Sequence, residues 1–425
     1  MPIGTSWKKK PAEGPFDAVV VGSGIGGLGA AAMLARRRGL RVLVLERHYT
    51  AGGFTHTFER NGFEWDVGLH YVGKVASGRG ALHGLFDYVT RGQLRWAPMP
   101  EVYDRIVIGD RSFDFAAGEE RFVDGLASSF PAERDGIRSY LAQVKACSRA
   151  ASPYFAAKAL PRRVAPLLGG LMRRGFLRHA RRTTGDVIAS HVKDPLLRAV
   201  LAGQYGDYGL PPSLSSFGNH ALVAEHYLDG AAYPVGGSSR VAETILPVIE
   251  AAGGHVAVAA DVESVVVENG AAAGVRLADG SVVRAPIVVS DVGWAGTVER
   301  LVPPEWRPRF PSLDGIPASS AHLALYVGLR GTAAELGLTG TNLWIYQGPE
   351  LDRSFQRFER DPGAPFPVVY LSFAAAKDPT FLDRGPGKAT LEAVTMGTWA
   401  PFAPWKGSRW RHRGPEYEAL KERLR

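Results

Sequence analysis

The segment Asp17-Ala18-Val19-Val20-Val21-Gly22-Ser23-Gly24-Ile25-Gly26-Gly27 decides how the first part of this chain folds. The run that precedes the glycines is mostly apolar, which is typical of a buried strand. An alanine-rich helix is predicted from Leu28 to Arg38, and Leu40 to Leu45 forms a second apolar strand that ends at Glu46. Strand, glycine turn, helix, strand and acid follow one another in the order of a βαβ dinucleotide-binding unit.

The glycines of this turn and the acid after it have separate physical roles. Gly22 permits the tight turn, Gly24 lets the backbone approach a pyrophosphate, and Gly27 lets the helix pack closely on the strand. Glu46 lies nineteen residues after Gly27 and is placed to accept hydrogen bonds from a ribose 2′-hydroxyl. A carboxylate there would repel a 2′-phosphate, so an FAD-type or NAD-type nucleotide is expected. The predicted phosphate cradle comprises Gly22, Ser23, Gly24, Ile25, Gly26 and Gly27.

The residues after Glu46 favour a flavin over a nicotinamide. Arg47 is followed by the pair Gly52 and Gly53, and then by Asp66-Val67-Gly68-Leu69-His70-Tyr71-Val72-Gly73. This arrangement resembles the flavoprotein group of amine oxidases and phytoene desaturases, and residues 66–73 are most similar to its retinol saturase and carotenoid isomerase branch. The resemblance implies FAD as the cofactor. It also implies that the cofactor site includes Arg47, Gly52, Gly53, Asp66 and Gly68.

A later part of the chain resembles the second pass of these flavoproteins through their FAD domain. Tyr233-Pro234-Val235-Gly236-Gly237 precedes a predicted helix over 241–252, and a series of predicted strands ends with a buried strand over 287–291. The resemblance implies that the backbone of Val262 binds the adenine. It also implies that Gly236 and Gly237 lie near the flavin.

The predicted fold is α/β, a Rossmann-like FAD-binding domain with an inserted helical and antiparallel-sheet substrate domain. Residues 1–14 are expected to form a disordered tail, residues 15–75 and 233–310 the FAD-binding domain, and residues 76–232 and 311–425 the substrate-binding domain. A hairpin is predicted over 102–115, and later strands are predicted to form an antiparallel sheet. Its aromatic residues fit either the wall of an apolar cavity or an ordinary core; they are Trp344, Tyr346, Tyr370, Phe373 and Trp399.

The composition fits a cytoplasmic globular protein. Of the 425 residues, 45% are hydrophobic and 22% are charged, and no apolar run is long enough to predict a spanning helix. Lys8 to Lys10 lack the apolar stretch of a signal peptide. Cys147 is the only cysteine, so no internal disulfide can form. No metal site is predicted, because Glu225 and His226 have no third ligand at a recognisable spacing.

The net charge of +8 comes from one segment. Residues 136–185 contain eleven Arg and Lys residues and no Asp or Glu. Within it, residues 161–178 mix Leu, Met and Phe with pairs of arginines, a pattern that suits attachment to an anionic membrane surface. A solvated basic face explains the same pattern equally well. Nucleic-acid binding is not predicted, because no basic and aromatic pattern recurs elsewhere.

The resemblance implies an FAD-dependent oxidoreductase that saturates, desaturates or isomerises carbon–carbon double bonds of a hydrophobic isoprenoid, polyene or lipid-like substrate. His70 and Tyr71 are the candidate catalytic residues, and shaping their turn is the competing role. No motif identifies the electron donor. One alternative is an amine oxidase-like flavoenzyme. The other is a non-catalytic nucleotide-binding remnant, because nothing matches the family's C-terminal flavin-contacting segment; we expect the chain to be a fragment.

Overall fold

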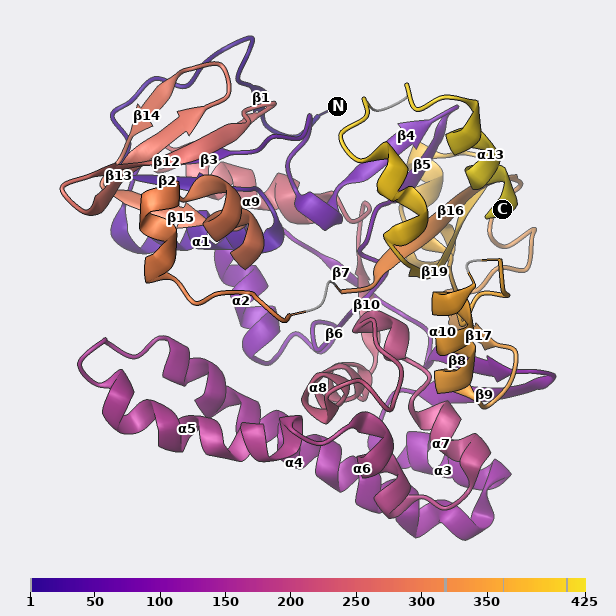
Figure 1. The fold of residues 1–425 in the computed structure, drawn as a ribbon. Coiled ribbons are helices and arrows are strands. Elements are labelled where there is room, and N and C mark those ends of the chain that lie inside the picture. Colours follow the sequence, from indigo (N-terminus) through magenta and orange to yellow (C-terminus); the bar gives the residue numbers. More distant parts are fainter. Residues whose placement is uncertain (1, 317–318, 362, 410–411) are drawn as a thin grey trace. The chain divides into compact units, whose positions relative to one another are not determined.

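The computed structural model describes residues 2–316, 319–361, 363–409 and 412–425 (Figure 1). The chain divides into two compact units. Unit 1 comprises residues 1–98, 232–317 and 377–387, and unit 2 comprises residues 99–231, 318–376 and 388–425. The assignment of a cofactor-binding role to the first and a substrate-binding role to the second stays a prediction.

A five-stranded parallel sheet forms the centre of unit 1, with the strand order β1-β11-β3-β2-β15. The strands are β1 (Thr5–Ser6), β2 (Ala18–Val21), β3 (Val42–Leu45), β11 (His255–Val258) and β15 (Ile287–Ser290). β2 and β3 are buried along their whole length. Burial on both faces explains why both strands are continuous apolar runs in the sequence.

Helices cover one face of this sheet, and a small antiparallel sheet covers the other. The helices are α1 (Ile25–Arg38), α2 (Ala81–Thr90) and α9 (Arg240–Glu250). The small sheet consists of β12 (Val262–Glu268), β13 (Ala271–Leu277) and β14 (Val282–Arg284). Val20 packs in the core with Leu28 of α1, whereas Val19 packs in the opposite core with Val275 of β13. Consecutive residues of one strand therefore serve two cores, as the pleat requires.

Three further parts complete unit 1. β4 (Thr57–Arg60) and β5 (Phe63–Asp66) form a hairpin. β6 (Val72–Gly73), β10 (Ala231–Pro234) and β7 (Trp96–Pro98) form a three-stranded sheet in that order. Residues 377–387, which include the last residue of the short helix α11 (Ala374–Lys377) and all of α12 (Phe381–Arg384), bring a late part of the chain into the unit. The predicted βαβ unit and the second set of strands are thus present, and both lie in unit 1.

Unit 2 combines a helical part with a six-stranded sheet. Its helices are α3 (Glu119–Ser129), α4 (Arg134–Lys158), α5 (Ala165–Ala180), α6 (Thr184–His191), α7 (Pro195–Leu201), α8 (Phe217–Tyr227), α10 (Leu351–Arg360) and α13 (Pro415–Arg423). The basic segment folds as the hairpin of α4 and α5, which run side by side (Figure 1). Phe176 of α5 packs on Tyr154 of α4 with ring centroids 4.7 Å apart.

The sheet of unit 2 has the order β16-β19-β18-β17-β8-β9. Its strands are β8 (Val102–Ile108), β9 (Arg111–Ala116), β16 (Ala321–Arg330), β17 (Asn342–Tyr346), β18 (Val369–Ser372) and β19 (Lys388–Gly397). The predicted hairpin of β8 and β9 is confirmed. The predicted antiparallel sheet of the later strands is confirmed for β16, β19, β18 and β17. The same sheet also contains the β8–β9 hairpin, because β17 pairs with β8 in parallel.

Buried polar side chains hold this parallel pair together. Asp104 of β8 lies beside Asn342 of β17 and accepts a hydrogen bond of 2.9 Å from its Nδ2. Gln204 donates to the other carboxylate oxygen at 2.7 Å. All three side chains are buried, and hydrogen bonding offsets the desolvation of the carboxylate. The aromatic Trp344 and Tyr370 pack against each other in the same sheet, with centroids 4.4 Å apart.

The predicted disordered tail over residues 1–14 is wrong for the segment that forms β1. Thr5 and Ser6 pair with Ala257 and Val258 of β11 at the edge of the parallel sheet. Trp7 is 5% exposed, and its indole Nε1 donates to Asp279 at 2.9 Å. A two-residue strand is too short to give a periodic pattern, so the sequence could not indicate it.

We predict that Trp7→Ala lowers the free energy of unfolding by about 3 kcal/mol, because it leaves a cavity in a core and removes the hydrogen bond to Asp279. The adjacent exposed Lys8 supplies the control, and Lys8→Ala is expected to change stability by less than about 0.5 kcal/mol. Urea unfolding followed by circular dichroism measures both variants. Equal stability of the two would contradict the placement of Trp7 in the core.

Candidate functional site

A cavity of about 700 Å³ opens in unit 1 beside the glycine turn. It lies at the carboxyl ends of β2, β3 and β15, where parallel α/β sheets bind ligands. The start of β12 and the 296–301 helical segment complete its wall. Nine of the predicted cofactor residues line this cavity: Gly22, Gly24, Ile25, Gly26, Glu46, Arg47, Gly52, Gly53 and Val262.

Close packing explains why glycines occupy this turn. A Cβ atom on Gly27 would lie 2.3 Å from the carbonyl oxygen of Gly22, so any side chain would push α1 away from β2. A Cβ atom on Gly53 would lie 2.9 Å from the Cα atom of Gly24, which means that the second glycine pair packs directly on the first. Gly53 also has a positive φ of 54°. The two glycine motifs therefore form one backbone surface on the cavity wall.

Ser23 connects Glu46 to the second glycine pair. Its hydroxyl and its backbone N–H donate to the same Glu46 oxygen at 2.8 and 2.9 Å, and Gly52 donates its N–H to the Ser23 hydroxyl at 3.2 Å. The backbone N–H of His48 donates to the other Glu46 oxygen at 2.8 Å. These bonds fix the carboxylate at the end of β3, facing the cavity, with acceptor capacity left for a ligand hydroxyl.

Asp291 is a residue of this site that sequence reasoning missed. It directly follows β15, and its backbone N–H donates to the carbonyl of Val21 at 2.8 Å. Its carboxylate lies against the glycine turn: Cβ atoms on Gly24 and Gly26 would lie 2.7 and 2.6 Å from its oxygens. Burial raises the pKa of the Asp291 carboxyl, the Gly27 amide opposes that rise, and the charge of Glu46 adds to it. No local sequence signal links residue 291 to residues 24–27.

An ion pair closes the opposite side of the cavity. Arg300 contacts Asp261 at 2.6 Å and donates to the carbonyl of Val262 at 3.3 Å. All three residues line the cavity. The pair fixes the backbone at the start of β12, which is where the resemblance places an adenine.

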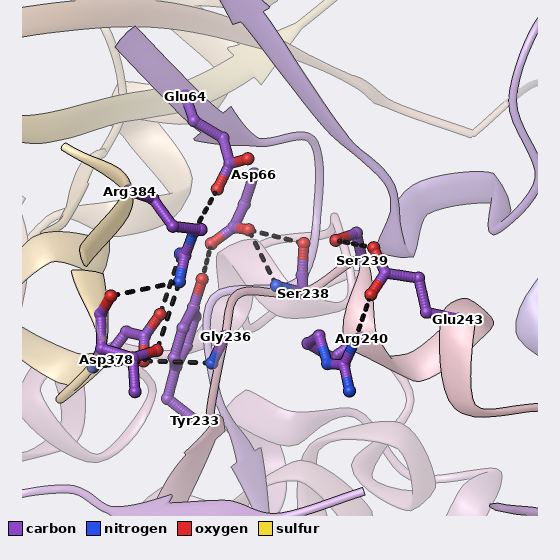
Figure 2. A network of polar contacts seen from close by, with 11 residues as sticks. Glu64, Asp66, Tyr233, Gly236, Ser238, Ser239, Arg240, Glu243, Asp378 and Arg384 are labelled. Carbon is purple, nitrogen blue, oxygen red and sulfur yellow. Dashed lines mark hydrogen bonds and ion pairs between the residues drawn. The ribbon is translucent and has the colours of Figure 1, made fainter. Parts of the chain in front are cut away.

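Asp66 lies in a buried polar network instead of in the cavity lining (Figure 2). One carboxylate oxygen accepts from the hydroxyl of Tyr233, and the other accepts from the hydroxyl of Ser238 at 2.5 Å and its backbone N–H at 3.3 Å. Asp66 therefore joins the Asp-x-Gly motif to the Pro-x-Gly-Gly turn. Gly68 packs on Phe54, with 3.1 Å between its Cβ position and the Phe54 Cβ, and Phe54 lines the cavity.

A second carboxylate, Asp378, holds the same turn from another segment. Figure 2 shows Arg384 between Asp378 and Glu64, at 2.8 and 3.2 Å from their carboxylates. Asp378 also accepts from the backbone N–H of Gly236 at 3.1 Å. Gly236 and Gly237 both have positive φ values, of 95° and 92°. Sequence reasoning did not single out Asp378 or Arg384.

The candidate catalytic residues lie between β5 and β6, outside the cavity lining. Tyr71 is buried, and His70 is half-buried. The buried Lys377 donates from Nζ to the carbonyl oxygen of His70 at 3.1 Å, and the same Nζ lies 5.7 Å from the Tyr71 ring centroid. Ser23, Gly27, Asp66, Gly68, Gly236 and Gly237 are likewise outside the lining, and all of these assignments stay predictions.

Two polar side chains of α8, His220 and Glu225, make hydrogen bonds with other side chains of unit 2. His220 is buried, and its ring nitrogens lie 2.6 Å from the Tyr140 hydroxyl and 2.9 Å from the Tyr208 hydroxyl. Burial lowers the pKa of His220 to about 3. Glu225 accepts a hydrogen bond of 2.9 Å from Ser148. In the part of the chain that the structure describes, no three His, Cys, Asp or Glu side chains are arranged to hold a metal ion.

Known proteins share sequence similarity with this chain. Residues 25–381 match the family described as flavin containing amine oxidoreductase. The chain is 37% identical to the all-trans-retinol 13,14-reductase of Danio rerio, over 96% of this chain and 70% of that protein. It is 31% identical to the inactive all-trans-retinol 13,14-reductase of the same organism, with the same coverage of both. It is 27% identical to the chloroplastic prolycopene isomerase of Daucus carota, over 69% of this chain and 49% of that protein.

A solved structure shares the fold. An oxidoreductase from Methanosarcina mazei superposes with a TM-score of 0.59 at 17% identity, over 96% of this chain and 83% of that one. At this identity the likeness concerns the fold alone.

Two glycines of α1 provide a matched test of the close packing. Gly27→Ala is expected to destabilise the chain by about 2 kcal/mol, because its Cβ meets the Gly22 carbonyl oxygen at 2.3 Å. Gly29→Ala, with no atom within 4 Å of its Cβ position, is expected to stabilise it by roughly 0.5–1 kcal/mol through helix propensity. Urea unfolding measures both. The same effect of both substitutions would mean that helix propensity, not contact with β2, determines the outcome.

Proposed function

This chain belongs to the family of flavin-containing amine oxidoreductases, and from this premise we propose that it is an FAD-dependent oxidoreductase that reduces a carbon–carbon double bond of a hydrophobic polyene. The similarity to all-trans-retinol 13,14-reductase over nearly the whole chain carries this proposal. The name of that relative favours saturation over desaturation and isomerisation. The substrate class follows from it: an apolar, conjugated, retinoid-like molecule.

The residues of the cavity fit the adenosine and pyrophosphate parts of FAD. Gly24 and Gly26 bring the backbone at the start of α1 to the cavity wall without side chains, and a helix N-terminus binds phosphate through its backbone amides. Glu46 is held in place to accept from ribose hydroxyls. The backbone of Val262, fixed by Arg300, would face the adenine.

A bound flavin supplies hydride transfer at its N5 atom. The chain's own residues would position the substrate, exclude water and deliver the proton that completes a saturation. His70 and Tyr71 remain our candidates for that proton, and Lys377 fixes their segment through the His70 carbonyl. The Asp66 and Asp378 networks hold this segment and the Pro-x-Gly-Gly turn in one arrangement. The electron donor is not assigned.

A non-catalytic nucleotide-binding protein is the second candidate, because one relative at 31% identity is itself named as inactive. It predicts that the chain binds FAD and that no polyene is turned over. An amine oxidase-like activity predicts turnover of amines instead. Both outcomes are distinguishable from retinoid saturation in one set of assays.

We predict that the purified chain binds about one FAD per molecule, seen as a flavin absorbance spectrum that is released on denaturation. With chemically reduced flavin and all-trans-retinol in detergent micelles, we expect loss of the retinol absorbance and formation of a dihydro product. Glu46→Gln is expected to weaken FAD binding about tenfold, because it replaces a charged acceptor with a neutral one. Bound flavin without turnover of retinol or other polyenes would favour the inactive alternative, and amine turnover would favour the oxidase.

We further infer that the hairpin of α4 and α5 attaches unit 2 to an anionic membrane surface. Leu167 and Leu171 are 80% and 68% exposed, and Arg174 and Arg178 continue the same helix face at the spacing of successive turns. Such a face presents apolar side chains to the acyl boundary and cations to the headgroups. A cytoplasmic location stays a prediction. No helix among the described residues is long and apolar enough to cross a membrane.

Vesicle sedimentation tests this attachment. Leu167→Ser with Leu171→Ser is expected to lower binding to vesicles that contain phosphatidylserine at least threefold, because each leucine contributes apolar burial. Arg174→Ala with Arg178→Ala is expected to lower it similarly at low salt and less at high salt. Leu336→Ser, at an exposed leucine elsewhere in unit 2, is the control and should bind as the unmodified chain does. Unchanged binding of both double variants would leave a solvated basic face as the explanation.

A further inference from the structure

We propose that Asp291 binds the cofactor's pyrophosphate as a neutral carboxylic acid, so that FAD binding takes up one proton. The inference rests on the proposed FAD binding and concerns how this particular cavity accommodates a phosphate. It gives a binding role to a residue that follows β15, far along the chain from the glycine turn.

The position of the carboxylate carries the argument. Its oxygens lie where Cβ atoms of Gly24 and Gly26 would be, at 2.7 and 2.6 Å, and 3.0 Å from the Cβ position of Gly27. These glycines form the first turn of α1 and its N-cap. Asp291 therefore occupies the concave surface of the glycine turn, which is the surface that a pyrophosphate needs.

The N-terminus of α1 has no acidic side chain of its own. No Asp or Glu occurs in the first turn of the helix, and its N-cap, Gly24, makes no side-chain hydrogen bond. Asp291 thus supplies an anion to the helix dipole from a neighbouring strand. A pyrophosphate would compete for the same amides with a larger negative charge. Two anions at one helix terminus repel each other, and the repulsion is relieved when one of them takes a proton.

The charges around Asp291 favour protonation of this acid over the others. Glu46, at the end of β3, faces it from one side and accepts hydrogen bonds from Ser23 and His48. Asp261, at the start of β12, is paired with Arg300 at 2.6 Å. Arg47 also lines the cavity. Asp291 has no ion pair among the described residues, and both burial and the charge of Glu46 raise its pKa.

A neutral carboxyl group would also make a new bond. Its O–H donates to a phosphate oxygen, whereas an ionised carboxylate has no proton to donate. The proton therefore replaces a repulsion with a hydrogen bond. The sign of the pH dependence follows: FAD affinity is highest at acidic pH, where Asp291 is already protonated, and falls by up to about tenfold per pH unit above its pKa in the free protein.

Calorimetric titration of FAD into the flavin-free chain tests the proposal. Performed at neutral pH in buffers of different ionisation enthalpy, it counts the protons taken up without requiring any variant. We expect close to one proton per FAD for the unmodified chain. Asp291→Asn, which is neutral and nearly isosteric, is expected to abolish this uptake and to bind FAD at least tenfold more tightly at alkaline pH. Asp261→Asn, which removes another acid from the same cavity, should retain the uptake.

Binding of FAD without proton uptake by the unmodified chain would overturn the role of Asp291 and leave the proposed function intact. The same would follow if Asp291→Asn retained the pH dependence of the unmodified chain. Failure of the unmodified chain to bind FAD at any pH would instead refute the proposed function. Circular dichroism spectra of both variants show whether they are folded.

Discussion

The contact between α1 and the end of β2 is the constraint on which the remainder of unit 1 depends. A Cβ atom on Gly27 would approach the Gly22 carbonyl oxygen to 2.3 Å, so the helix can lie this close only if it has no side chain there. The close approach brings the start of α1 to the edge of the sheet, where the Asp291 carboxylate lies against it. The second glycine pair then packs on the first through Gly53, and Ser23 connects both to Glu46. The cavity results from this packing.

The carboxylates of unit 1 described above lie in two different environments. Asp66 and Asp378 are buried and accept several hydrogen bonds or an ion pair from fixed protein groups, which offsets their desolvation. They connect segments that are distant in the sequence and therefore act on geometry. Glu46 and Asp291 face the cavity and keep capacity for a ligand. Removing an acid of the first kind should lower stability, whereas removing one of the second kind should change binding.

The parts that follow from local pattern could be predicted from the sequence. The βαβ unit needs only buried strands, a glycine turn and a helix that are adjacent in the chain, and the structure has all of them. The hairpin of β8 and β9 was equally local. The polar network of Asp66 could not be predicted in this way, because its partners Tyr233 and Ser238 come from a distant part of the chain. β1 and the parallel pairing of β8 with β17 also depend on long-range contacts that leave no periodic signal.

The same reasoning explains why Asp291 could not be found from the glycine motif. The motif specifies a backbone surface that attracts negative charge, but not which negative group lies on it. β15 pairs with β2 in parallel, and the register places the residue after Ser290 beside the residue after Val21. An acid at that position therefore reaches the amides of α1, whereas the next side chain, the apolar Val292, packs against Gly22 on the wall of the same cavity. Strand register, which the sequence does not reveal, decides that this acid belongs to the site.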